Sequence, residues 1–222
     1  GPIVGHIILA DEINRTSPKT QSALLESMAE SSISIDGETI ILPKPFFVMA
    51  TQNPIEYEGT YPLPEAQLDR FLLKIKMGYP SAEDEVEILR RTEKQSPIQT
   101  LEPVISLEEL LALQEEVKNI YVDDSVKAYI VELARATRDV PSVYLGVSPR
   151  GSIALMKASQ AYAKMQGRDF VKPDDIQYLA PYVFGHRMIL TPEARYEGVT
   201  VEEIIDNIIT KSIIPIKRFA EK

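Results

Sequence analysis

A short apolar run, from His6 to Ala10, leads directly into two adjacent acids, Asp11 and Glu12. A continuous apolar run of this length predicts a strand whose two faces are both buried, as in a parallel sheet that helices cover on both sides. Ligands of open α/β sheets bind just beyond the carboxyl ends of such strands. There, one acid could hold hydrated Mg²⁺ while the other orients and deprotonates an attacking water. Alternatively, Asp11 and Asn14 are turn residues that lead into the next helix.

A second apolar run, Phe46 to Ala50, ends in the polar cluster Thr51-Gln52-Asn53-Pro54. Because a polar cluster again follows an apolar strand, we expect Asn53 to point toward the same crevice as Glu12. An amide in that position can hold a water or a phosphate oxygen. The competing interpretation is an Asx turn ahead of the proline.

Between these two strands the sequence predicts a helix and a hairpin. Ser17-Pro18 starts the helix, since serine caps free amides and proline suits the first helical position. Asp36-Gly37, flanked by alternating residues, is typical of a two-residue hairpin loop. The apolar residues that share one face of this hairpin are Ile33, Ile35, Ile40 and Leu42. The hairpin is either a lid on the core or a protruding contact element.

A proline-rich loop, 55–64, leads to a short predicted helix at 65–71. Residues 72–77 alternate between apolar and polar side chains and predict a third strand. Arg70, at the end of the short helix, has two interpretations. It is either a cation favoured by the helix dipole or a charge presented to a phosphate.

The chain changes character near residue 80, after which no strand is predicted. The α/β part is 1–80, a connecting helix and linker occupies 81–96, and a helical bundle occupies 97–222, which gives an α/β plus all-α fold. The residues expected to start helices are Ser81, Ser106, Asp123 or Asp124, and Ser148. The apolar stripes of two of these helices are Leu107, Leu110, Leu111 and Val117, and Val126, Ile130, Leu133 and Thr137.

Arg150 occupies the first turn of the helix that Ser148-Pro149 opens. A cation at the positive end of a helix dipole is mildly unfavourable unless an anion is nearby. This observation is weak by itself. Combined with Asp11, Glu12 and Asn53, it indicates a phosphate clamp.

Composition excludes several classes of protein. The 222-residue chain has 44% apolar and 26% charged residues, which is typical of globular proteins. The absence of cysteine and the presence of only two histidines disfavour disulfides and zinc sites. No apolar run approaches the ~20 residues that span a bilayer, and no signal sequence is apparent, so we expect a cytoplasmic protein. A net charge of −9 disfavours broad nucleic-acid binding.

Four stretches together resemble the MoxR group of AAA+ ATPases. They are Leu9-Ala10-Asp11-Glu12-Ile13-Asn14-Arg15, Ala50-Thr51-Gln52-Asn53-Pro54, Leu63-Pro64-Glu65-Ala66-Gln67-Leu68-Asp69-Arg70-Phe71 and Gly146-Val147-Ser148-Pro149-Arg150-Gly151. They occur in the family's order and cover most of the chain. The resemblance implies a partial AAA+ core with a β-hairpin insert, followed by a helical lid.

The resemblance also implies roles for individual residues. Asp11 and Glu12 match the Walker B acids, with Asp11 on the metal, and Asn53 matches the sensor-1 residue. Arg70 matches the arginine finger, and Arg150 matches the sensor-2 arginine. The implied catalytic set is Glu12, Asn53, Arg70 and Arg150, and the implied nucleotide-binding set is Asp11, Glu12, Asn53 and Arg150. The implied cofactors are ATP and Mg²⁺.

Three functions are compatible with these features. The first is an ATP-driven chaperone-like remodeller that assembles into a ring, of six subunits in this family, and acts with partners carrying von Willebrand A domains. The second is another member of the clade, such as a magnesium-chelatase-like subunit or a DNA motor, although the acidic charge disfavours the motor. The third is an interaction module that has lost the chemistry, against which the retained acids and arginines argue.

One departure from the family concerns the phosphate loop. The sequence contains no Gly-x-x-x-x-Gly-Lys-[Ser/Thr], the loop whose amides and lysine cradle phosphates. The chain also opens at Gly1, immediately ahead of a strand that needs neighbours. We therefore expect a piece of a longer ATPase, with this piece alone inactive.

Overall fold

The computed structural model of the chain describes residues 3–35, 37–53, 61, 63–92, 98 and 101–214. Some predicted features lie outside these residues, wholly or in part: Asp36 of the hairpin turn, the proline-rich loop 55–64, the linker that follows residue 92 and the end of the chain beyond residue 214.

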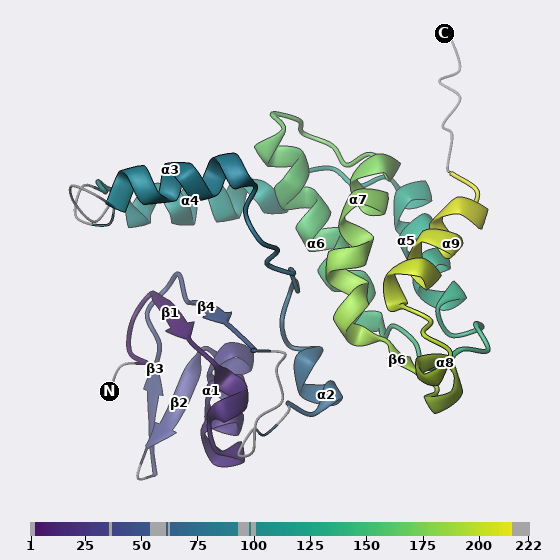
Figure 1. The fold of residues 1–222 in the computed structure, drawn as a ribbon. Coiled ribbons are helices and arrows are strands. Elements are labelled where there is room, and N and C mark those ends of the chain that lie inside the picture. Colours follow the sequence, from purple (N-terminus) through teal and green to yellow (C-terminus); the bar gives the residue numbers. More distant parts are fainter. Residues whose placement is uncertain are drawn as a thin grey trace, which may run out of the picture.

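The described elements form an α/β part followed by a mainly helical part, with α2 between them (Figure 1). In chain order they are β1 (Ile7–Ala10), η1 (Ile13–Arg15), α1 (Pro18–Glu30), β2 (Ser32–Ile35), β3 (Glu38–Ile41), β4 (Phe47–Ala50), α2 (Glu65–Leu68), α3 (Ala82–Thr92), α4 (Leu107–Lys118), α5 (Asp124–Ala136), β5 (Val143–Leu145), α6 (Pro149–Met165), α7 (Pro173–Phe184), η3 (Gly185–Arg187), β6 (Ile189–Leu190), α8 (Pro192–Tyr196) and α9 (Val201–Lys211). The predicted fold class is confirmed, whereas the boundaries near residues 80 and 97 stay predictions.

Strands β1 and β4 pair in parallel, with Ile7 opposite Phe47 and Ala10 opposite Ala50. One side of this pair contacts an apolar cluster built on α1, which includes the buried residues Ile13, Leu24 and Leu25. The other side is exposed in the described chain. Its residues are Ile7, Leu9, Phe47 and Met49, with exposed fractions between 45% and 63%. The prediction of a strand buried on both faces is therefore wrong for this chain, because no described segment covers the second face.

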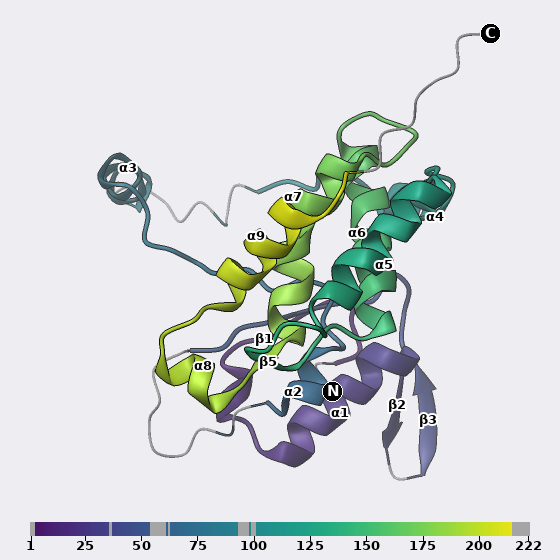
Figure 2. The same ribbon diagram turned by 90° about the vertical axis from the view of Figure 1, so that its right-hand side faces the viewer.

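The hairpin of β2 and β3 has the predicted register, with Ile33 opposite Ile40 and Ile35 opposite Glu38. Its base is buried at Ile33 and Leu42, and β2 packs beside α1. On β3, Ile40, which lies opposite Ile33, is exposed. The hairpin thus combines the two alternatives: its base packs on the α/β part beside α1, and β3 carries an exposed apolar residue. Figure 2 shows the two strands beside α1.

Residues 72–77, predicted as a third strand, pair with no described strand. Instead, the Lys74 backbone N–H donates to the Tyr182 carbonyl of α7 at 2.9 Å, and Lys76 forms an ion pair with Glu202 of α9. The prediction was wrong because alternation identifies a strand only where a neighbouring strand supplies the hydrogen bonds. Here the helical part supplies these contacts, so the segment runs along its surface.

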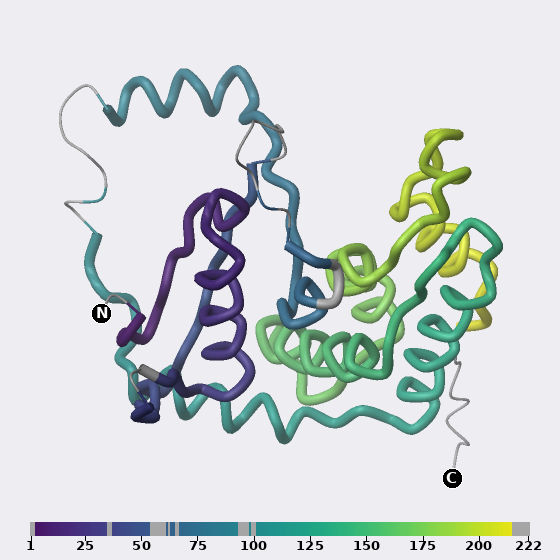
Figure 3. Tube along the Cα trace, turned by 90° about the horizontal axis from the view of Figure 1, so that it is seen from below, coloured from purple at the N-terminus to yellow at the C-terminus, as the bar shows by residue number. Residues whose placement is uncertain are grey.

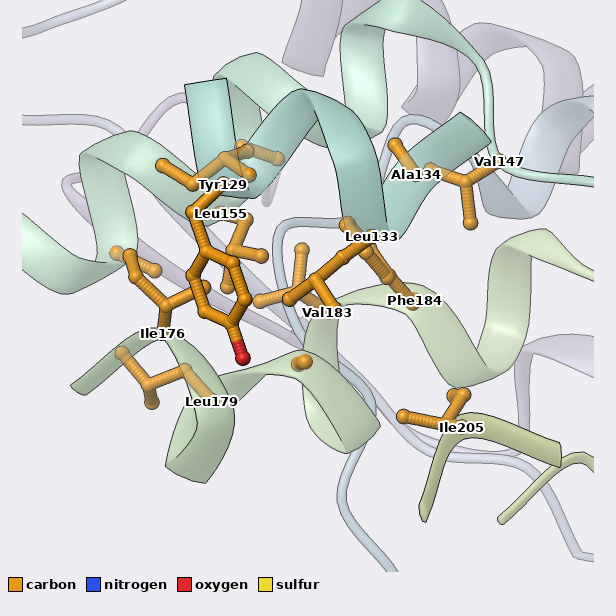
Figure 4. Close-up of a cluster of buried hydrophobic side chains, with 14 of the residues drawn as sticks. Tyr129, Leu133, Ala134, Val147, Leu155, Ile176, Leu179, Val183, Phe184 and Ile205 are labelled. Carbon is orange, nitrogen blue, oxygen red and sulfur yellow. The ribbon is translucent and has the colours of Figure 1, made fainter. Parts of the chain in front are cut away.

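The helical part has one apolar core, to which α5, α6, α7 and α9 contribute. Tyr129 and Leu133 of α5, Leu155 of α6, and Ile176 and Val183 of α7 converge in it (Figure 4). All four residues of the stripe predicted for α5 are buried, as the helical period requires. At the end of α7, η3 contacts α2, which joins the helical part to the α/β part (Figure 3).

The helical part departs from the prediction in three places. In α4 the predicted capping box of Ser106 and Glu109 is confirmed, but Leu107 and Leu111 are exposed and no residue of this helix is buried. Strands β5 and β6 pair as a short antiparallel ribbon that the sequence did not predict. Their two- and three-residue lengths are too short for alternation to be recognised. The five-residue helix α8 also escaped prediction.

Candidate functional site

The carboxyl ends of β1 and β4 lie side by side and bring the two predicted polar clusters together. Thr51 continues the β4 ladder by donating its backbone N–H to the Ala10 carbonyl at 3.0 Å. The Ile13 N–H donates to the Thr51 carbonyl at 3.0 Å. Asp11, Glu12 and Asn53 consequently lie at one edge of the sheet, as parallel pairing predicts.

Thr51 is a residue that the sequence interpretation missed at this edge. Its hydroxyl donates to Asp11 Oδ1 at 2.5 Å and accepts the Glu12 backbone N–H at 2.8 Å. One side chain therefore holds the carboxylate of Asp11 and the backbone of Glu12. The available signal was its position, because the first residue after β4 lies next to the first residue after β1 when the two strands pair in register.

Glu12 turns the chain from β1 into η1 with a left-handed backbone, φ 48° and ψ 49°. A non-glycine residue in this region is uncommon and is frequent at functional sites. Its carboxylate Oε2 lies 3.1 Å from Arg15 Nε, and both side chains are more than a third exposed. An exposed pair of this kind contributes about 0–1 kcal/mol, so little free energy is needed to release the carboxylate.

Asn53 is half-buried, and its backbone carbonyl accepts a hydrogen bond from Asn14 Nδ2 at 3.1 Å. Asn14 lies in η1 and is itself buried. The two asparagines tie the segment after β4 to the turn that carries Glu12. Because this contact involves the backbone of Asn53, both interpretations of its side chain stay predictions.

A second cluster forms around Asp69, at the end of α2. Arg187 Nε donates to Asp69 Oδ1 at 2.8 Å, and Arg150 Nη1 lies 3.9 Å from Asp69 Oδ2. The Ser148 hydroxyl makes a long contact of 3.4 Å with the same Oδ2. Ser148 is the N-cap residue of α6, yet its side chain makes no capping hydrogen bond. The anion expected near Arg150 is thus the carboxylate of Asp69.

Arg70 follows Asp69 directly and is exposed. Its guanidinium makes no hydrogen bond or ion pair with another described residue. The structure therefore divides the predicted site residues into two groups: Asp11, Glu12 and Asn53 at the sheet edge, and Arg70 and Arg150 beside Asp69. This arrangement leaves the roles of all five residues as predictions.

The start of α6 is fixed from two directions. The Val147 N–H donates to the Thr137 hydroxyl, and Arg138 Nε donates to the Val147 carbonyl, both at 2.9 Å. On the other side, a Cβ added at Gly151 would lie 2.4 Å from Val147 Cγ1 and 3.0 Å from Arg187 Cδ. Glycine at this position therefore lets the stem of Arg187 pass directly beside the helix turn that carries Arg150.

His186 lies buried against the Asp69 cluster, with Nε2 2.9 Å from the Phe71 carbonyl and 2.8 Å from Arg187 Nη1. Burial lowers the pKa of His186 from its ordinary 6.5 to about 4, and the adjacent Arg187 cation contributes to the decrease. At neutral pH the imidazole is therefore uncharged in the folded protein.

We expect acidification from pH 7 to 4 to reduce the free energy of unfolding by about 3 kcal/mol through His186 alone. The folded pKa lies below the unfolded pKa, so the unfolded state binds more protons between pH 6.5 and 4. The contribution is therefore fully present above pH 6.5 and is lost as the pH falls. Urea unfolding of the parent and His186→Gln proteins at several pH values tests this. The difference between their unfolding free energies should change across this window, and a constant difference would contradict the assignment.

The described residues bear on whether this chain could bind a metal ion and whether its helices could span a membrane. The described residues contain no group of three or more His, Asp or Glu side chains arranged to hold a metal ion. Asp11 is a single carboxylate beside a threonine hydroxyl, and this donor set suits Mg²⁺, which keeps several waters and binds substrate phosphates. Among the helices of the described chain, none is long and apolar enough to span a membrane.

Comparison with known proteins assigns both parts of the chain. Residues 1–73 match the family described as "ATPase family associated with various cellular activities (AAA)", and residues 135–208 match the AAA lid domain. The chain is 63% identical over 220 residues to YeaC of Bacillus subtilis, covering 99% of this chain and 69% of YeaC. It is 45% identical over 224 residues to Chaperone MoxR1 of Mycobacterium tuberculosis, covering 97% and 59%.

A solved structure shows the same arrangement of elements. The crystal structure of a protein from Cytophaga hutchinsonii superposes with a TM-score of 0.92 at 39% identity, covering 97% of this chain and 68% of that protein. The chain thus spans between 59% and 69% of the length of these three proteins. The resemblance drawn from the four sequence stretches is confirmed: the chain belongs to the MoxR-type AAA ATPases and comprises part of the AAA core followed by the lid.

Proposed function

We propose that this chain forms the Walker B, sensor and lid portion of an enzyme that hydrolyses Mg-ATP and couples hydrolysis to remodelling of a partner protein. The observation that carries the proposal is the sheet edge, where the Thr51 hydroxyl holds the carboxylate of Asp11 and the backbone of Glu12. Family membership implies ATP binding, and the sheet edge provides the acids that the reaction needs.

The two acids have different tasks in this proposal. Asp11 has one oxygen held by Thr51, which leaves its second oxygen to bind Mg²⁺ or a water of its shell. The Glu12 carboxylate lies at the tip of the turn, in a weak ion pair with Arg15. When released, this carboxylate orients a water and accepts its proton as the water attacks the γ-phosphate. Asn53, on the adjacent segment, holds that water or a γ-phosphate oxygen.

The two arginines complete the proposed site. Arg150 has a 61% exposed side chain and only a marginal ion pair with Asp69. A nucleotide phosphate offers more charge and more acceptor oxygens than this carboxylate and can displace it. Arg70 is exposed at the end of α2, apart from the sheet-edge group, so we propose that it reaches the nucleotide of a neighbouring subunit. This arrangement requires a ring, which we propose to have six subunits.

The partner of the ATPase is proposed from resemblance. MoxR1 is named a chaperone, and proteins of this type work with partners that carry von Willebrand A domains. We propose the same class of cytoplasmic partner here and a remodelling or maturation role. The net charge of −9 favours a protein partner over a nucleic acid.

A comparison of two proteins tests the proposed reaction. Full-length protein that contains this chain is expected to release phosphate from ATP in a Mg²⁺-dependent manner. The 222-residue chain alone should hydrolyse ATP at background and give at most weak heat in calorimetry, because its sequence contains no phosphate loop. Absence of turnover in the full-length protein would favour a non-catalytic interaction module. Micromolar ATP affinity of the 222-residue chain would contradict the need for a separate phosphate loop.

A further inference from the structure

Arg187 of η3 is a buried cation that contacts the segment carrying Arg70. Its side chain is 2% exposed. Besides Asp69 Oδ1, its acceptors in that segment are the carbonyls of Asp69 at 3.2 Å, Phe71 at 2.6 Å and Leu72 at 3.2 Å. A further N–H donates to the carbonyl of Val183 in α7. Four hydrogen bonds of the guanidinium therefore go to oxygens of residues 69–72.

The residues that carry these four oxygens lie on both sides of Arg70 in the sequence. Residues 69–72 form turns and bends outside the regular helix. Within the segment, the Arg70 N–H donates to the Gln67 carbonyl at 3.2 Å and the Phe71 N–H to the Leu68 carbonyl at 3.0 Å. The core side of the segment is held by Leu68 and Phe71, which pack against the α1 cluster. Apolar packing of this kind is non-directional. The directional contacts that tie this backbone to the helical part come from Arg187, with His186 beside it at the Phe71 carbonyl.

Arg187 also lies against the helix turn that carries Arg150. Its Cδ occupies the space next to Gly151, and its partner Asp69 is also the residue that contacts Arg150. One buried side chain thus joins the segment of Arg70, the start of α6 and the end of α7. Burying a guanidinium is costly even when it is paired, and an apolar residue would often stabilise a core equally well. Stability alone is therefore a poor explanation for this arrangement.

We propose that Arg187 is a positioning residue that ties the segment of Arg70 to the lid and so sets the orientation of the arginine finger at the subunit boundary. This inference rests on the proposed function of Arg70 as a finger acting on a neighbouring subunit. It adds a residue that touches neither nucleotide nor Mg²⁺ and acts on Arg70 through the segment 69–72.

The test replaces Arg187 with lysine in the full-length protein. Lysine keeps the charge but cannot reproduce the planar fork that reaches several acceptors at once. We expect kcat to fall about 10²-fold, the scale of a 1 Å misplacement of a catalytic group, with KM for ATP nearly unchanged. The matched control is Arg168→Lys, because Arg168 forms a half-buried two-point pair with Asp175 in the same lid, away from α2. Its turnover should stay near that of the parent.

Mixing inactive subunits separates positioning of the finger from general damage. If Arg187→Lys impairs only the finger, mixing it with Glu12→Gln subunits should restore turnover, whereas mixing it with Arg70→Ala subunits should not. Restoration with Arg70→Ala would overturn the proposal, because the Arg187→Lys subunits would then be supplying an intact finger. Normal turnover by Arg187→Lys alone would also overturn it.

Two controls keep the outcomes distinct. If Arg187→Lys fails to enter rings, Asp69→Asn replaces it, since this change keeps the shape but weakens the hold of Arg187 on the segment. Asp69→Asn should show the same mixing pattern, and restoration with Arg70→Ala would overturn the proposal. Arg70→Ala alone tests the proposed function separately. Full turnover of Arg70→Ala would show that Arg70 is not an arginine finger. Inactive Arg70→Ala together with fully active Arg187→Lys would contradict only the positioning role of Arg187.

Discussion

Replacing Arg70 with alanine in the full-length protein is expected to lower ATP turnover by about 10³–10⁵-fold while leaving nucleotide affinity nearly intact. An arginine finger offers two parallel hydrogen bonds to charge that develops only in the transition state. Arg70 is exposed, and its guanidinium is engaged by no other described residue. Its loss should therefore leave the fold of the subunit unchanged and remove only transition-state stabilisation.

Steady-state phosphate release and calorimetric ATP binding measure the two quantities separately. Arg90→Ala is a matched control, because Arg90 is an exposed arginine on α3 whose side chain makes a long ion pair with Glu87. It should retain the turnover of the parent. A large loss of ATP affinity in Arg70→Ala would instead assign Arg70 to ground-state binding. Unchanged turnover would exclude it from the reaction.

The parts of the fold that were predictable from sequence depend on local chemistry. The Ser106–Glu109 capping box is complete in the structure, and Asp123 caps α5 through the Ser125 N–H. The hairpin register followed from Asp36-Gly37 because a two-residue loop fixes the pairing of its strands. In each case, neighbours in sequence supply both partners of the interaction.

The predictions that were wrong needed information about distant partners. Residues 72–77 alternate as a strand does, but the Lys74 N–H bonds to the carbonyl of Tyr182, more than a hundred residues along the chain. The stripe predicted for α4 has the right period, yet the described chain does not cover Leu107 or Leu111. Periodicity identifies an apolar face and does not identify what will cover it.

The residues of the candidate site show the same difference between features set by the local sequence and features set by distant partners. Asp11, Glu12 and Asn53 could be brought to one edge from sequence, because each follows an apolar run that pairs in parallel. Thr51 and Arg187 could not be identified. Thr51 gains its role only from the strand register, and Arg187 only from the docking of η3 on the end of α2. Residues that position others thus escape a reading based on motifs.

Glu12→Gln is expected to retain ATP binding while turnover falls by about 10²–10⁴-fold, the usual contribution of a general base. Glutamine keeps the size of the side chain but cannot accept the proton of the attacking water. Asp11→Asn provides the contrast, because it removes charge from the metal's shell and should weaken Mg²⁺-dependent nucleotide binding instead. Undiminished turnover in Glu12→Gln would remove Glu12 from the reaction.

The two inactive proteins, Glu12→Gln and Arg70→Ala, also test whether the site is shared between subunits. In a head-to-tail ring, each proposed site combines Glu12 of one subunit with Arg70 of its neighbour. A one-to-one mixture then contains intact pairs at roughly a quarter of its interfaces if subunits assemble at random. Partial turnover should therefore return on mixing, provided that the rings exchange subunits. If mixed rings form and no ratio restores turnover, Arg70 acts within its own subunit or has only a structural role.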